Sequence, residues 1–451
     1  MTDWREPLLA GLAPLPDGPT SDAVRAGVFE LGDQAVVAVA WDFAVKGGSF
    51  GVDEAEVFVT AARLAARDRL PLVSFLRSGG TRLQQGMHAL VGIPRALLAL
   101  REVAAAGVPH VAVVDQPTTG GVWVVGAAAD VRLAVAGATV GFSGARAIEA
   151  MTGVALGPGA NTAESALAAG LVDDVVAGDD VPARLDAILA TLGPDRPEPL
   201  GLPTPVPVPS RRRWEQVAHS RQVGRLDGAA LLGLLPGPGA TTVPLLGGDH
   251  TVAAAVVRIA GRRMVVAAVA ARRAMRVGPA GYRLLERAAG LAGRLDVPLV
   301  TLVDTPGADP LPDSEQAGTA AAVGGAMSAV LDCTAPTVAV VHGEGGSGGA
   351  LAAAVCDAVG VTPDGWFAAL GPEGAAATLR TTPEEAADLM HVAPGDLLAA
   401  GFADAMAPTE PDALRGWLVA QVDQLRVSGV RRERWARRLA ETQEKSPADG
   451  E

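Results

Sequence analysis

The chain is poor in the residues that build metal sites and cationic surfaces. Its 451 residues include only two cysteines, Cys333 and Cys356, and six histidines that form no HxH or HxxxH pair. A structural zinc ion needs about four Cys or His ligands at short spacing, so no bound metal is expected. Only two lysines are present, Lys46 and Lys445, and the net charge is −13. Nucleic-acid binding requires a cationic footprint, and we therefore expect no nucleic-acid partner.

Long apolar runs are also missing. The longest uncharged run, residues 228–248, carries three prolines and six glycines, so it indicates a loop and not a membrane helix. The N-terminal residues lack the basic-then-apolar order of a secretory signal. The arginine clusters at 211–213 and 431–438 are interpreted as solvated linker and helix faces. These features favour a cytoplasmic protein without membrane contact.

What the chain does contain is a repeat. The first copy has PLVSFLRSGGTRLQQG from Pro71 and VAVVDQPTTGGVWVVGAAADV from Val111, and the second has PLVTLVDTPGADP from Pro298 and VAVVHGEGGSGGALAAAVCDAV from Val338. The offset between matching motifs is 227 to 231 residues. Self-similarity at a fixed period predicts two domains of one fold. We expect Gly120 to superpose on Gly348.

Domain boundaries follow from the prolines and the apolar pattern. Seven prolines between 194 and 209 indicate an extended linker, which we place at 194–215, between domains at 1–193 and 216–451. Strand-length apolar runs at 35–43 and 72–76 flank a helical pattern at 57–65, and runs at 264–270 and 299–303 flank another at 284–295. This alternation predicts α/β domains with parallel strands. Residues 411–444 are predicted to form one or two amphipathic helices.

In both halves a strand runs into a glycine-rich turn and then an alanine-rich segment. A helix that starts at such a turn offers unpaired backbone N–H groups at the positive end of its dipole. Glycine lets a bulky acyl group approach those amides, because no Cβ intervenes. The pattern predicts an oxyanion hole made of backbone.

Two other motifs match the second turn. Residues 343–348 satisfy GxGxxG, a dinucleotide-binding pattern. Residues 345–349 satisfy GxSxG, which would make Ser347 a nucleophile with Asp364 or Asp388 and then His391 downstream. The scattered histidines otherwise offer no obvious side-chain base, which suits chemistry in which substrate or cofactor supplies the base.

The motifs resemble the carboxyltransferase component of biotin-dependent acyl-CoA carboxylases, with a β-type and an α-type half fused in that order. The first half carries SGGTRLQQG, PTTGGV and VGFSGARAIE, and the second carries DTPGADP, GEGGSGGALA and GPEGAAATL. The resemblance implies an α/β architecture of two tandem crotonase-like domains, each a ββα superhelix. The N-terminal zinc ribbon of the bacterial β subunit has no counterpart here.

The resemblance also implies a reaction. A carboxyl group passes from carboxybiotin, held by a separate carrier protein, to the α-carbon of a short acyl-CoA such as acetyl-CoA or propionyl-CoA. Gly120 and Gly121 would stabilise the thioester enolate, and Gly349 with Ala350, next to Gly348, would hold the biotin ureido oxygen. Further substrate-binding positions would be Gly79, Gly80, Arg82, Phe142, Gly144, Arg146, Gly371 and Gly374. Contacts to the CoA phosphates would come from Arg77, Arg82 or Arg146.

The expected partners follow from the same resemblance. Neither lysine has methionine neighbours, as a biotinylated lysine would, so biotin must act in trans on a carrier protein supplied by a biotin carboxylase subunit. A homo-oligomer, a dimer or hexamer, would place each active site between the first domain of one subunit and the second of another. Two alternatives stay open beside the hydrolase: a malonyl-thioester decarboxylase and a non-catalytic scaffold of the same fold.

Overall fold

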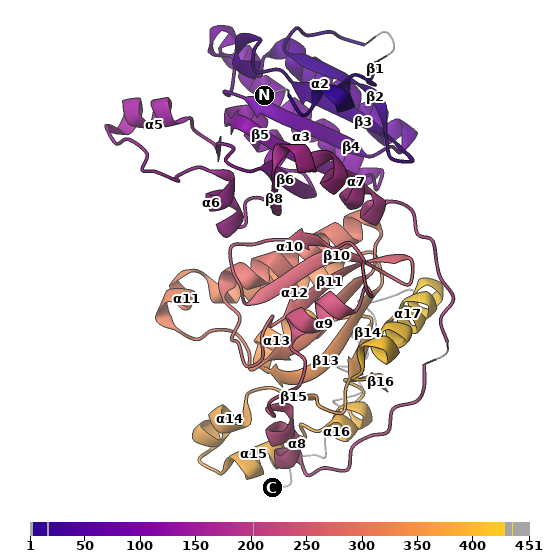
Figure 1. Ribbon diagram of the computed structural model, residues 1–451. Helices are drawn as coiled ribbons and strands as arrows, with labels where there is room; N and C mark the ends of the chain where they lie inside the picture. Colours follow the sequence, from indigo (N-terminus) through magenta and orange to yellow (C-terminus); the bar gives the residue numbers. More distant parts are fainter. Residues whose placement is uncertain (1–2, 16–17, 202, 429–434, 436–451) are drawn as a thin grey trace. The chain divides into compact units, whose positions relative to one another are not determined.

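The computed structural model describes residues 3–15, 18–201, 203–428 and 435. The chain divides into two compact units, Met1–Gly193 and Pro194–Glu451. Each unit is built around one eight-stranded sheet with helices packed against it (Figure 1). None of the helices in these ranges is long and apolar enough to cross a membrane.

The sheet of the first unit has the order β1-β2-β3-β4-β5-β6-β8, with β7 paired to β5. Its strands are β1 (Ala13–Pro14), β2 (Val24–Leu31), β3 (Gln34–Trp41), β4 (Leu72–Ser78), β5 (His110–Thr119), β6 (Val131–Val135), β7 (Val140–Gly141) and β8 (Asp174–Val176). Its helices are α1 (Glu6–Leu9), α2 (Val52–Asp68), α3 (Met87–Ala105), α4 (Gly120–Ala127), α5 (Ala145–Thr152), α6 (Ala163–Ala168) and α7 (Val181–Leu192).

The second unit repeats this plan with the sheet order β16-β14-β13-β12-β11-β10-β9 and β15 paired to β13. Its strands are β9 (Val243–Leu245), β10 (Val252–Ile259), β11 (Arg262–Val269), β12 (Leu299–Thr305), β13 (Thr337–Gly346), β14 (Ala358–Val361), β15 (Trp366–Ala368) and β16 (Ala405–Met406). Its helices are α8 (Arg213–Ser220), α9 (Gly228–Leu234), α10 (Pro279–Leu295), α11 (Pro312–Gln316), α12 (Thr319–Asp332), α13 (Ser347–Ala354), α14 (Pro372–Leu379), α15 (Pro383–Leu389), α16 (Pro394–Ala399) and α17 (Pro411–Ser428).

The predicted α/β class is confirmed, but the sheets are not purely parallel. β2 pairs with β3, and β10 with β11, in antiparallel hairpins that precede the parallel strands. Two-residue turns make these hairpins, with Gly32 at φ +59° in the first and Ala260–Gly261, both at positive φ, in the second. The prediction treated only the second strand of each hairpin and missed these turns.

The two central strand pairs fix the register of the repeat. Ser78 pairs with Thr118 in the first unit, and Thr305 pairs with Gly345 in the second, an offset of 227 at both strands. Helix α4 begins at Gly120 and helix α13 at Ser347, and both residues have φ near +63°. Gly120 therefore corresponds to Ser347, and the expected match with Gly348 is wrong by one residue.

The first residues of the proline-rich segment are hydrogen-bonded to the second unit. The N–H groups of Arg196 and Glu198 donate to the carbonyls of Gly261 and Ala260 in the β10–β11 turn, and α8 starts within the predicted linker. In the arginine cluster that follows, Arg213 pairs with Asp396 at 2.7 Å. Of the predicted C-terminal helical stretch, α17 covers 411–428; the cluster at 431–438 lies outside the described residues except for Trp435, whose indole donates to the Cys356 carbonyl at 3.2 Å.

Candidate functional site

The glycine turn of the first unit lies where β4 and β5 end side by side. Gly80 has φ +117° and Gly120 has φ +63°, conformations that side chains disfavour. A Cβ at Gly120 would lie 2.7 Å from the Gly80 Cα. Two loops therefore approach so closely that only glycine fits at position 120.

Most amides of this turn are already used. Gly79 donates to the Gly47 carbonyl at 2.8 Å, and Gly120 donates to the Phe142 carbonyl at 3.0 Å. Gly80 donates to the Ser78 hydroxyl at 3.0 Å. Gly120, predicted to stabilise an enolate, therefore shapes the turn and does not offer its N–H to a substrate.

Two neighbouring amides in this turn have no partner among the described residues, those of Thr81 and Gly121. The Thr81 nitrogen lies 3.3 Å from the position of a Cβ on Gly120, and the Thr81 hydroxyl lies 3.1 Å from that of a Cβ on Gly121. The amide of Gly121 belongs to the first turn of α4, where N–H groups lack helical partners. Gly121 was predicted as a donor, and Thr81 was missed because a backbone donor leaves no side-chain signal.

The second unit repeats this arrangement. Gly307 has φ +125° and donates its N–H to the Thr305 hydroxyl at 3.1 Å, as Gly80 does to Ser78. The residues that correspond to Thr81 and Gly121 are Ala308 and Gly348, and neither N–H has a recorded partner within the ranges that the structure describes.

Helix α13 places the other two predicted donors differently. The Gly349 N–H donates weakly to the Ser347 hydroxyl at 3.4 Å, and Ala350 is fully buried. A Cβ on Gly348 would meet open space, whereas one on Gly349 would collide with the Ala308 nitrogen and the Tyr282 hydroxyl. Gly348 is thus the accessible donor of this helix turn, and Gly349 is required for packing.

Ser347 does not belong to a catalytic triad. The proposed acids lie elsewhere: Asp364 pairs with His219 at 2.8 Å, and Asp388 with Arg213 at 3.5 Å. His391 is an exposed residue that lies 3.9 Å from Asp396. No histidine contacts Ser347 among the interactions recorded in the described residues, so the serine-hydrolase arrangement is not formed.

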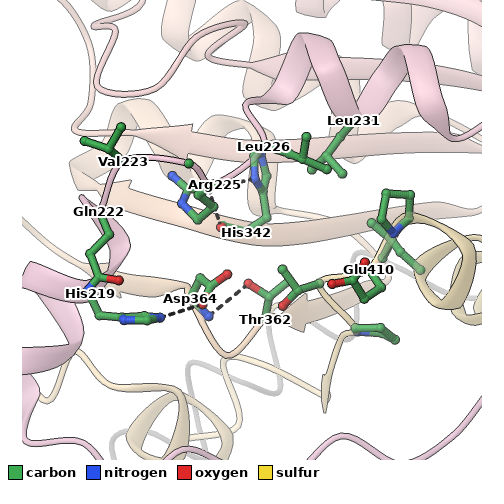
Figure 2. A pocket seen from close by; sticks show the side chains of 15 residues that line it. His219, Gln222, Val223, Arg225, Leu226, Leu231, His342, Thr362, Asp364 and Glu410 are labelled. Carbon is green, nitrogen blue, oxygen red and sulfur yellow. Dashed lines mark hydrogen bonds and ion pairs between the residues drawn. The ribbon is translucent and has the colours of Figure 1, made fainter.

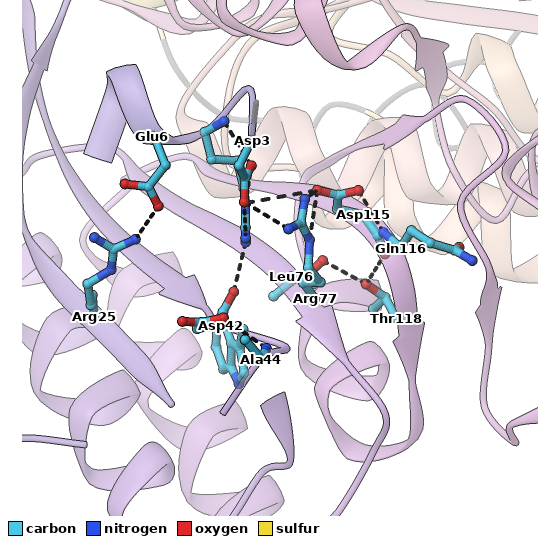
Figure 3. A network of polar contacts seen from close by, with 12 residues as sticks. Asp3, Glu6, Arg25, Asp42, Ala44, Leu76, Arg77, Asp115, Gln116 and Thr118 are labelled. Carbon is cyan, nitrogen blue, oxygen red and sulfur yellow. Dashed lines mark hydrogen bonds and ion pairs between the residues drawn. The ribbon is translucent and has the colours of Figure 1, made fainter. Parts of the chain in front are cut away.

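A polar cluster supports the turn of the first unit (Figure 3). Arg77 donates to Asp115 at 3.1 Å and to Asp3 at 2.9 Å. Arg5, also from the N-terminal segment, pairs with Asp3 at 2.9 Å and donates to the Trp41 carbonyl at 2.7 Å. Burial alone would raise the pKa of Asp3, but hydrogen bonds and charge from Arg5, together with the charge of Arg77, hold it well below its usual range.

The predicted CoA-binding arginines have different surroundings. Arg77 belongs to the cluster just described. Arg82 is buried and donates to Glu54 at 2.8 Å and to the Ser49 carbonyl at 2.9 Å. Arg146 is exposed on α5, with no ion pair recorded for it in the described part of the chain. Only Arg146 keeps a guanidinium available for a phosphate.

The remaining predicted substrate positions flank the two turns. Phe142 is 70% exposed, and its carbonyl accepts the Gly120 N–H. Gly144 and Gly371 are the N-cap residues of α5 and α14 and correspond to each other at the 227-residue offset. Gly374 lies in the first turn of α14, where a Cβ would approach Leu370 to 3.3 Å. Within the described ranges no cluster of three or more metal-ligating side chains is found.

The fold and the paired glycine turns define a class: a tandem α/β protein with two crotonase-like units. Two family models match the chain, a carboxyl transferase domain over residues 15–172 and an acetyl co-enzyme A carboxylase carboxyltransferase-like domain over 250–435. The fold is similar to that of transcarboxylase 12S, with a TM-score of 0.77 at 21% identity over 94% of this chain and 89% of that one.

Curated relatives extend the match over both units. The acetyl-coenzyme A carboxylase carboxyl transferase subunits beta/alpha of Salinispora arenicola are 37% identical, over 86% of this chain and 73% of the relative. A probable biotin-dependent acyl-coenzyme A carboxylase beta3 subunit of Mycobacterium bovis is 35% identical, over 87% of this chain and 81% of the relative. The chain belongs to the carboxyltransferase family of biotin-dependent acyl-CoA carboxylases.

Proposed function

We propose that this chain transfers a carboxyl group from carboxybiotin on a carrier protein to the α-carbon of a short acyl-CoA, acetyl-CoA or propionyl-CoA. The observation that carries the proposal is the presence of two equivalent pairs of unpartnered backbone amides, one in each unit. Carboxyl transfer to a thioester develops negative charge on two different oxygens. A pair of amides is suited to each of them.

The amides of Thr81 and Gly121 would bind the thioester oxygen and stabilise it as it becomes an enolate. Preorganised donors of this kind typically contribute ~10²–10³ in rate each. Those of Ala308 and Gly348 would bind the ureido oxygen. Biotin supplies the carboxyl group and, in this family, the base that takes the α-proton. This division fits a turn whose own side chains include no general base.

We further propose that the chain works as a homo-oligomer. Several apolar side chains on α3 and on the turn before it are exposed. They are Leu83, which is 85% exposed, Met87, Leu90, Val91 and Leu98. Met87, Leu90 and Val91 follow at helical spacing and Leu98 lies two turns further on, so these side chains form an apolar stripe along one side of α3. Such a stripe is costly in water, and a second copy of the chain is the occupant that the family resemblance favours. The thioester and biotin turns would then meet at a subunit boundary.

The proposal is tested by reconstitution. The purified chain should carboxylate an acyl-CoA only when a biotinylated carrier, a biotin carboxylase, ATP and bicarbonate are supplied, and the chain itself should give no streptavidin signal. A panel of acyl-CoAs of increasing length, compared by kcat/KM, would identify the substrate. CO2 release from malonyl-CoA without biotin would instead support the decarboxylase, and absence of acyl-CoA binding would support the scaffold.

A further inference from the structure

The ends of β12 and β13 are joined by a buried carboxylate. The strand register shifts between Val303 and Thr305, where Asp304 lies. One Asp304 carboxylate oxygen accepts the backbone N–H of Glu344 at 2.8 Å, across the gap between the two strands. The residue is 0% exposed. Asp304 therefore fixes the separation of two strands that continue into the turn at Gly307–Ala308 and the helix start at Ser347–Gly348.

The other Asp304 oxygen accepts from Arg225, which comes from the loop between α8 and α9. Arg225 Nη2 lies 2.6 Å from Asp304 Oδ2, and Nη1 lies 2.7 Å from the His342 carbonyl and 3.1 Å from His342 Nδ1. Nε donates to the Ser220 carbonyl at 3.1 Å. With its side chain only 9% exposed, Arg225 connects both strand ends to α8. Figure 2 shows its guanidinium beside His342.

His342 completes the cluster in a single tautomer. Burial lowers the pKa of His342 to about 4, so the imidazole is neutral near pH 7. Arg225 can only donate, and His342 Nδ1 must therefore be the acceptor, which leaves the proton on Nε2. A neutral imidazole lets the guanidinium lie against the ring without repulsion.

We propose that Arg225 and Asp304 are positioning residues for the biotin-side amide pair. They touch no substrate; they act through the Glu344 N–H and the His342 carbonyl on the separation between Ala308 and Gly348. Removing one partner of a buried ion pair lowers stability, so the test has to separate stability from rate. The positioning role acts on the rate, because a misplacement of about 1 Å at a reacting group costs about 10²-fold. The inference rests on the proposed function.

The test uses the full chain and the transfer of a carboxyl group from malonyl-CoA to free biotin. Arg225→Gln should lower kcat by about 10²-fold, while the calorimetric Kd for malonyl-CoA stays within about twofold of wild type. Arg225→Lys, which keeps the charge but cannot form the planar fork, should lose about tenfold. The control is Arg262→Gln, which removes a more exposed ion pair in the same unit, with Asp423 at 2.9 Å; its kcat should not change.

The possible outcomes separate a positioning role from a structural one. A purely structural Arg225 would lower the melting temperature and leave kcat per folded molecule unchanged, which would overturn the inference; so would an equal loss in Arg262→Gln. Should Arg225→Gln not fold, the Arg225→Lys result decides, because full activity there contradicts the proposal. An inactive wild-type chain would refute the proposed function itself, and the inference with it.

Discussion

Both units have a bulge where their central strands end, at Leu76–Ser78 in the first and at Val303–Thr305 in the second, but the residue inside the shift has the opposite charge. At the 227-residue offset Arg77 corresponds to Asp304, and Asp115 corresponds to His342. In the first unit the carboxylate is on β5, where Asp115 accepts the N–H of Gln116 at 2.7 Å and pairs with an arginine on β4. In the second unit the carboxylate is Asp304 on β12, and the arginine that pairs with it, Arg225, comes from the loop between α8 and α9. In both units one carboxylate oxygen accepts a backbone N–H of the bulge, and the other oxygen accepts from an arginine. The repeat therefore preserves this hydrogen-bond pattern, although different residues make it.

The helices after the turns differ more strongly. In the second unit Arg221 pairs with Glu344 on β13 at 3.1 Å and with Glu373 on α14, and so fastens α14 to the end of the strand. The residue that corresponds to Glu373 is Arg146, on an α5 that projects from the sheet of its own unit (Figure 1). The first unit thus leaves its equivalent helix without this clamp, consistent with a role in contacting a phosphate or another subunit.

The largest expected loss of activity comes from substitution of a turn glycine. Gly120→Ala should abolish carboxyl transfer, because its Cβ would lie 2.7 Å from the Gly80 Cα at a positive φ. Gly290→Ala is the control: it lies in α10 with nothing within 4 Å of a Cβ, and should stabilise the helix by up to about 1 kcal/mol. Activity and circular dichroism of both variants check this. An active Gly120→Ala protein would contradict the close approach of the two loops.

Asp115→Asn should be the next most damaging change. It leaves Arg77 facing a neutral amide in a cluster where Asp115 is only 5% exposed, and removing one partner of a buried pair costs about 3–5 kcal/mol. Chemical denaturation measures the loss. If the unfolding free energy falls by less than about 1 kcal/mol, Asp3 alone suffices for Arg77 and Arg5.

The buried His342 should make the stability of the second unit depend on pH. In the unfolded chain it protonates near pH 6.5, whereas burial lowers its folded pKa to about 4. The unfolded state therefore binds more protons between these values, and stability is lost as the pH falls from 6.5 towards 4. From pH 6.5 to 5 the contribution amounts to about 2 kcal/mol. His342→Gln should flatten the curve of unfolding free energy in this window, and the exposed His250→Gln should not.

Gly349→Ala should lower stability, whereas Gly348→Ala should affect biotin binding. The first places a Cβ against the Ala308 nitrogen and the Tyr282 hydroxyl and should cost about 1–3 kcal/mol in stability. The second points into open space, so the protein should melt normally but show a raised KM for biotin. Thermal melts and biotin kinetics distinguish them, and equal melting temperatures would contradict the packing at Gly349.

The smallest effect is expected at Ser347. Ser347→Ala removes only the weak contact with the Gly349 N–H, and activity should stay within about threefold of wild type. A folded but dead variant would revive the nucleophile hypothesis, because loss of a catalytic serine costs about 10⁶.

The sequence predicted the repeat, the α/β class and the importance of the paired glycines, because these features recur as letters at a fixed spacing. It missed Thr81 and Ala308, since any residue type can supply a backbone N–H. It misplaced the register by one because Ser347 adopts the left-handed conformation that glycine adopts at position 120. Arg82 was predicted as a ligand because Glu54, its partner on α2, is distant in the sequence.

The arginine that binds the bulge carboxylate comes from within the same unit in both cases, Arg77 in the first and Arg225 in the second. The segment after Gly193 is already fastened to the β10–β11 turn. A chain cut at Gly193–Pro194 should therefore yield two polypeptides that each keep their glycine turn. Circular dichroism and thermal melts of each half produced alone would check this.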